Sequence, residues 1–146
     1  MKQLLFLLAT IGSTLFSCKK ADSCDPIPAS LDGKWRMIIV KENSSGLTTI
    51  KPSSIQGDVD ITFTSTSPTN GIFTGKTPTN SISQNDYSTG ANQSLAIPNL
   101  SMTKVMETTW GNEFVQNIRN SQEYRFEAGD RLTIKTINKT LTFKKL

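Results

Sequence analysis

The chain has 146 residues, with 16 basic and 12 acidic side chains that give a formal net charge of +4. It contains no histidine and only two cysteines. Without histidine, neither a Ser-His-Asp triad nor a histidine-ligated metal site can form, and no carboxylate cluster has metal-ligand spacing. Because no basic run is interleaved with aromatic residues, nucleic acid is not an expected partner. We therefore expect no enzymatic activity, no metal and no cofactor.

The first residues resemble a bacterial lipoprotein export signal. Lys2 supplies a positive start, and the apolar run after it is shorter than the roughly 20 residues that span a bilayer. Leu15 stands three places before Cys18, and the small residue Ser17 stands one place before it. We therefore predict a signal peptide at residues 1–17 and lipidation of Cys18.

A lipid on Cys18 predicts where the protein is held. A diacylglycerol with an amide-linked fatty acid gives stable anchoring, whereas one acyl chain holds a protein only marginally. We expect attachment to the cell envelope, at the outer membrane of a Gram-negative bacterium. Residues 18–30 are expected to form a flexible tether, and residues 31–146 one domain. Cys24 then has no intramolecular cysteine partner, and the protein is expected to be a monomer.

The first half of the domain is typical of β-strands. Residues 35–42 are rich in β-branched and aromatic side chains, and residues 58–64 alternate strictly between polar and apolar. Asn70-Gly71 predicts a turn, followed by a returning strand at 72–76. The polar stretch at 77–92 is compatible with a loop or with a short strand inside a long connection.

The next predicted element is a helix at about residues 110–120. Either Thr109 or Asn112 can cap its start through a side-chain oxygen. Hydrophobic residues recur every four places, which indicates a helix packed on a core rather than a partner groove or a membrane-facing surface. This hydrophobic stripe consists of Trp110, Phe114 and Ile118.

Three short alternating strands follow, with tight turns at residues 128–130 and 138–139. Three strands alone would leave two unpaired edges, which natural sheets close or cover. We therefore predict a mainly β fold, a small antiparallel and partly open β-barrel with one packed α-helix. The expected core residues are Trp35, Ile61, Phe63, Phe114, Ile118, Leu132, Ile134 and Phe143.

The order of short motifs resembles a META domain, also called an HslJ-like domain. Gly33-Lys34-Trp35 is similar to the start of that family, Glu113-Phe114-Val115 to its helix and Gly129-Asp130 to its last hairpin. Thr79 and Glu107 stand where many members carry cysteines, so a family disulfide would be missing here. The resemblance implies a partly open barrel in an envelope or secreted protein linked to stress tolerance, and it carries over no catalytic residue.

Two functions follow as hypotheses. The first is a non-enzymatic, lipid-anchored cell-envelope protein with a binding or accessory role in stress tolerance. The alternative is a lipocalin-like carrier of a small apolar ligand, because Gly33-Lys34-Trp35 is also similar to the start of lipocalins, whose barrel mouth holds the ligand. Asp58 and Asp60 share one face of a strand, and we expect solvent exposure of both rather than acid–base chemistry.

Overall fold

The computed structural model describes residues 30–146, so the predictions for Cys18, Cys24, the signal peptide and most of the tether lie outside the described residues. In the described part, no helix is long and apolar enough to cross a membrane. The elements of this part are β1 (Gly33–Glu42), β2 (Thr48–Ile50), β3 (Asp60–Ser65), β4 (Asn70–Lys76), β5 (Ser81–Thr89), the 3-10 turn η1 (Ala91–Gln93), β6 (Leu95–Ala96), α1 (Thr109–Asn117), the 3-10 turn η2 (Ile118–Asn120), β7 (Ser121–Glu127), β8 (Arg131–Thr136) and β9 (Lys139–Lys145).

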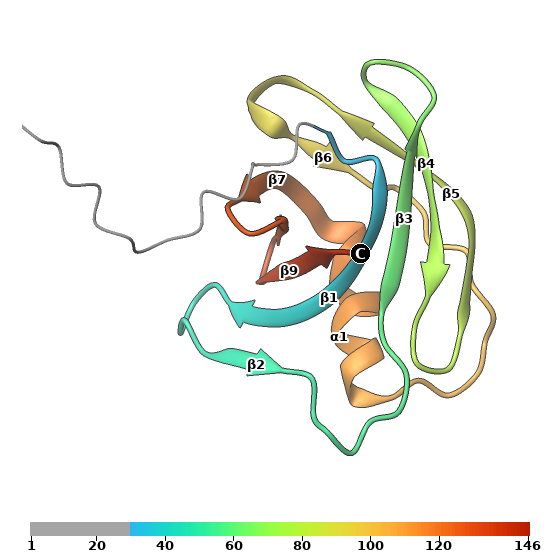
Figure 1. The fold of residues 1–146 in the computed structure, drawn as a ribbon, viewed down its shortest axis with the longest axis vertical. Coiled ribbons are helices and arrows are strands. Elements are labelled where there is room, and N and C mark those ends of the chain that lie inside the picture. The colour runs from blue at the N-terminus through green and yellow to red at the C-terminus, as the bar shows by residue number, and fades with distance from the viewer. Residues whose placement is uncertain (1–29) are drawn as a thin grey trace, which may run out of the picture.

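Eight strands form one antiparallel sheet in the order β6-β5-β4-β3-β1-β9-β8-β7, and β2 pairs with β1 off this path. The sheet curls until its two end strands, β6 and β7, lie close together (Figure 1). An isolated bridge between Ser94 and Glu123 joins the two ends at this seam. The curl leaves little free edge, as a stable β protein requires. The prediction of a small antiparallel, partly open β-barrel with one helix is confirmed.

Large apolar side chains fill the space between the curved sheet and α1. The ring of Phe63 lies edge-on to that of Tyr87 at 5.1 Å, and Phe114 of α1 lies edge-on to Phe143 of β9 at 6.5 Å. Such buried aromatic pairs add about 0.5–1.5 kcal/mol to the effect of their area burial. The predicted core residues that are at most 1% exposed are Trp35, Ile61, Phe63, Phe114, Ile118, Leu132, Ile134 and Phe143.

The helix α1 starts where the sequence pattern indicates, but its cap differs. Thr108 is the N-cap rather than Thr109 or Asn112, and its hydroxyl accepts a hydrogen bond from the Gly111 amide at 3.1 Å. After α1 ends, η2 continues the helical path through Asn120. The helical region therefore covers the predicted segment, with its start fixed one residue earlier than expected.

The prediction of a turn at Asn70-Gly71 is wrong. The turn between β3 and β4 lies at residues 66–69, where the Ser67 hydroxyl accepts a hydrogen bond from the Asn70 amide at 3.1 Å. Gly71 lies inside β4, at a position where a side chain would not fit. An added Cβ would stand 2.5 Å from both the Thr64 carbonyl oxygen and the Tyr87 ring.

The polar stretch at 77–92 contains a full strand, β5, and not the loop or short strand that its composition suggests. Ile82 and Tyr87 of this strand are buried, and so is the polar Asn85. The Asn85 side chain accepts a hydrogen bond from the Ser101 amide at 2.6 Å and donates one to the Ser83 carbonyl, also at 2.6 Å. The simple polar–apolar alternation breaks at a register shift, because Phe73 pairs with Asn85 and Gly75 with Ile82, so that two steps along β4 match three along β5.

Candidate functional site

The outer surface of β1, β9, β8 and β7 carries three rows of side chains that run across the strands. Successive side chains of a strand alternate between the two faces of the sheet, so the neighbours of the core residues project outwards. We call this set of twelve residues the basic face. The strand register gives its rows as Arg36, Lys144, Arg131 and Glu127; Ile39, Thr142, Thr133 and Arg125; and Lys41, Thr140, Lys135 and Glu123.

The charges of the basic face are unbalanced. It holds six Lys or Arg residues and two Glu residues, a formal net charge of +4 that equals the value for the whole chain. Lys41, Arg131, Lys135 and Lys144 form no ion pair with any residue from 30 to 146. Arg131 and Lys144 are register partners on strands only about 4.8 Å apart, so these two cations repel each other. An anion bound among them would relieve that repulsion.

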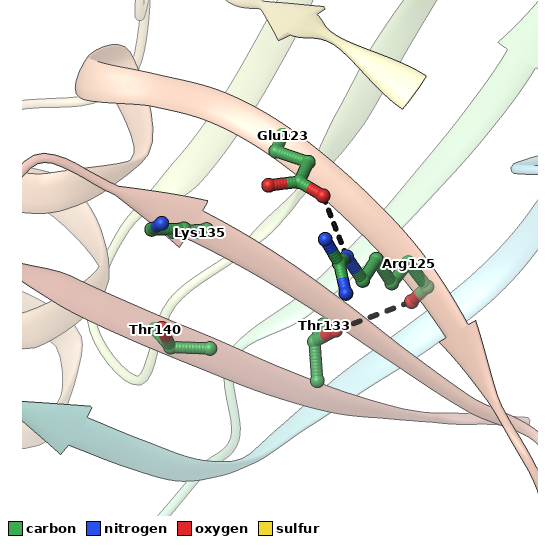
Figure 2. Close-up of a pocket in the computed structure, with 5 residues that line it drawn as sticks. All are labelled: Glu123, Arg125, Thr133, Lys135 and Thr140. Atoms are coloured by element: carbon green, nitrogen blue, oxygen red, sulfur yellow. Dashed lines mark hydrogen bonds and ion pairs between the residues drawn. The ribbon is translucent and has the colours of Figure 1, made fainter. Parts of the chain in front are cut away.

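Two adjoining hollows indent the basic face. The smaller one encloses about 270 Å³ between Glu123 and Arg125 of β7, Thr133 and Lys135 of β8, and Thr140 of β9 (Figure 2). The larger one encloses about 530 Å³ and shares Thr133, Lys135 and Thr140 with the smaller. It continues over β1 as far as Lys41, and Thr48 of β2 also lines it. Because the two hollows share residues, they form one groove, which we call the outer groove.

Some side chains in the outer groove already form hydrogen bonds within the protein, and others do not. Arg125 Nε donates to Glu123 Oε1 at 2.5 Å, and the Thr133 hydroxyl donates to the Arg125 carbonyl at 3.3 Å. Figure 2 shows this pair on β7, with the Lys135 side chain on β8 apart from it. Lys135 has no hydrogen-bond partner within residues 30–146, so its ammonium group is available to a ligand.

A second charged cluster lies around Asp60, and it corrects the expectation that this residue is exposed. Asp60 is only 2% exposed, because Arg36 Nε and Nη2 donate to its two carboxylate oxygens at 2.7 and 3.1 Å. The Nζ atoms of Lys34 and Lys76 lie 4.0 and 3.8 Å from Asp60 Oδ2. These long side chains cover the carboxylate with their apolar stems.

Asp58 belongs to the same cluster and is half-buried. A hydrogen bond from Lys51 Nζ at 2.7 Å lowers the pKa of Asp58, and Arg36 Nη1 at 2.9 Å lowers it further. Both carboxylates are therefore engaged in ion pairs, and Asp58 is held ionised. A group held in one protonation state is poorly suited to general acid–base chemistry, so the cluster serves the fold.

A third polar cluster surrounds Glu107, just before α1. Its carboxylate accepts hydrogen bonds from the hydroxyls of Thr77 and Thr79, from Asn80 Nδ2 and from the Thr108 amide, the last three at 2.9 Å. Burial alone would raise the pKa of Glu107, but these four donors hold it below its ordinary value. The bonds tie the β4–β5 turn to the start of α1. Thr79 and Glu107, which are 28 residues apart in the sequence, are thus joined by a hydrogen bond.

The side chains that usually bind metals or carry catalysis do not cluster in the described part of the chain. No set of three or more Asp, Glu, Cys or His side chains is placed to hold a metal ion within residues 30–146. Lys76 is directed at Asp60, and Lys104 is exposed. The basic face is the site that the sequence pattern does not reveal. In the sequence, the only indication of this face is that Arg131, Thr133 and Lys135 alternate with buried residues. The other residues of the face join them through the pairing of the strands.

Comparison with known proteins supports the fold and adds no function. No family model matches the chain, and no curated protein matches it either. Among solved structures, the chain is similar to the NMR structure of a protein from Burkholderia xenovorans, with a TM-score of 0.57 and 19% sequence identity. The similarity covers 87% of this chain and 94% of that one. The chain is therefore a small antiparallel β-barrel protein, and its resemblance to META domains stays a prediction.

Proposed function

We propose that this protein is a non-enzymatic cell-envelope protein that binds an anionic component of the envelope on its basic face. The observation that carries the proposal is the set of four unpaired cations, Lys41, Arg131, Lys135 and Lys144, on and around the outer groove. A lipid on Cys18 would hold the barrel at the outer membrane of a Gram-negative bacterium. The META-like order of motifs supports an accessory role in stress tolerance.

Lipid attachment has a direct test in the two cysteines of the chain. Changing Cys18 to serine is expected to move the protein from the membrane fraction to the soluble fraction and to remove the mass of the acyl groups. Changing Cys24 to serine is the matched control and is expected to leave both properties unchanged. A Cys18→Ser protein that stays in the membrane fraction with an unchanged mass would contradict lipidation.

The alternative function, a lipocalin-like carrier, places the ligand inside the barrel. It has less support because Trp35, Phe63, Phe73 and Phe143 are at most 1% exposed and occupy the interior. Both tryptophans of the chain, Trp35 and Trp110, are buried there, so intrinsic fluorescence reports on the interior.

Titration with palmitate is expected to leave the tryptophan fluorescence unchanged, because large buried side chains occupy the interior where the acyl chain would lie. The measurement is an emission spectrum at each palmitate concentration, with N-acetyltryptophanamide as the control for non-specific quenching. A saturable change with about one palmitate per chain would favour the carrier over the outer groove.

A further inference from the structure

We infer that the ligand of the basic face is an acidic polysaccharide, a linear chain of hydroxylated sugar units with carboxylates at intervals. The inference rests on the proposed function, namely that the basic face binds an anion, and it adds the chemical class of that anion. Three features of the outer groove lead to it: the spacing of the cations, the hydroxyl groups between them, and the kinds of side chain that the face lacks.

Apart from Arg131 and Lys144, which are register partners on β8 and β9, the unpaired cations are spread over the basic face. Lys41 and Lys135 are separated by strand β9, which places their backbones about 10 Å apart. Arg131 and Lys135 stand four residues apart on β8, which corresponds to about 13 Å. A small anion can be held by the register partners Arg131 and Lys144, whereas contact with Lys41 and Lys135 as well requires a ligand that extends along the face. A polymer with charges at intervals can contact several of them in turn.

Neutral hydroxyl groups lie between these cations. Thr140 and Thr142 of β9 and Thr133 of β8 line the larger hollow, and Thr48 of β2 lines it from the side of β1. The hydroxyls of Thr133, Thr140 and Thr48 already donate, to the Arg125 carbonyl, Asn43 Oδ1 and the Gly46 carbonyl, so what they offer a ligand is acceptor lone pairs. Sugar hydroxyls can donate to these oxygens when the polymer lies in the groove. This arrangement suits a ligand that carries hydroxyl groups and charges along the same chain.

Two other anionic partners fit the basic face less well. A single-stranded nucleic acid is held largely by stacking of its bases on aromatic side chains, and none of the twelve residues is aromatic. Lys and Arg alone attract anionic lipids, but amphipathic membrane surfaces add apolar side chains that enter the headgroup region, and Ile39 is the one apolar member of the face. The face is also hollowed, whereas a bilayer is flat on this scale.

The test uses the full lipidated protein, inserted in phosphatidylcholine vesicles on a biosensor surface. Polygalacturonate is the probe, and neutral dextran of similar length is the control polymer. Polygalacturonate is expected to bind at neutral pH, with an affinity that falls as salt screens the charges, and dextran is expected not to bind. Phosphatidylglycerol vesicles and single-stranded DNA are passed over the same surface as competing anions.

Two double variants with the same change in charge locate the site. Changing Arg131 and Lys135 to glutamate is expected to weaken polygalacturonate binding by about tenfold or more. Changing Lys104 and Arg119 to glutamate alters exposed cations outside the basic face, and binding is expected to change by less than about twofold. Both pairs are exposed, so a thermal melt is expected to show a folded protein in each case.

The outcomes separate the inference from the function on which it rests. Equal binding of polygalacturonate by the two double variants would overturn the basic face as the site and, with it, the inference that an acidic polysaccharide is the ligand of that face. Stronger binding of phosphatidylglycerol vesicles or DNA, lost on changing Arg131 and Lys135, would overturn the polysaccharide and leave the anion-binding function standing. If none of the anions binds, the proposed function fails as well. If the variant with glutamate at 131 and 135 unfolds, changing Arg131 and Lys135 to glutamine removes the same two positive charges and tests the same site.

Discussion

Replacing Gly75 with alanine is expected to lower the free energy of unfolding by about 3 kcal/mol, the upper end of the usual cost of overpacking. Gly75 lies opposite Ile61 of β3, and opposite Ile82 of β5 just after a register shift in the β4–β5 pairing. An added Cβ would stand 2.2 Å from the Asp60 carbonyl oxygen and 2.9 Å from Ile61 Cα. Both are backbone atoms of a paired strand, so relief requires that β3 and β4 separate.

Urea denaturation followed by circular dichroism measures this loss of stability. Gly90→Ala is the matched control, because the Cβ there would meet the Ser94 hydroxyl at 2.8 Å, and that side chain can rotate away. We expect the control to cost less than about 1 kcal/mol. If Gly75→Ala and Gly90→Ala prove equally stable, the close approach of β3 and β4 at this point is not what requires glycine.

The parts of the fold that could be predicted are those in which one strand carries its own pattern. Ile61 and Phe63, and then Leu132 and Ile134, alternate with polar residues, and all four side chains are buried. The register of such strands is set by burial, because a slip of one residue would turn every apolar side chain to solvent. The barrel then follows from the need to close the edges of the sheet.

The parts that could not be predicted depend on partners distant in the sequence. Asp60 looks like an exposed carboxylate until Arg36 is placed beside it by the pairing of β1 with β3. The alternation of β5 changes phase at a register shift against β4, and the inward Asn85 is paired with the backbone of Ser101. The basic face has the same origin, since its residues come from four strands and meet only through register. No local pattern contains this information.

Changing Glu107 to glutamine is expected to lower the free energy of unfolding by about 2 kcal/mol at neutral pH. Each carboxylate oxygen of Glu107 accepts hydrogen bonds, one from Thr77 and Asn80 and the other from Thr79 and Thr108. In the glutamine variant, the side-chain NH2 group replaces one of these oxygens. It then points at groups that themselves donate hydrogen bonds, whichever oxygen is replaced. The β4–β5 turn loses part of its attachment to α1, and the cost is that of partly buried hydrogen-bonding groups left unpaired.

The pH dependence identifies the carboxylate charge as the source of this stability. The fold lowers the pKa of Glu107, so its contribution is complete above the unfolded value of about 4.3 and is lost as the pH falls through the folded value. The difference between the wild type and Glu107→Gln in urea denaturation should therefore be constant near neutral pH and shrink below about pH 4. Glu127→Gln makes the same chemical change at an exposed site and should cost less than about 0.5 kcal/mol. A difference for Glu107→Gln that persists undiminished at low pH would mean that the shape of the side chain, and not its charge, joins the turn to the helix.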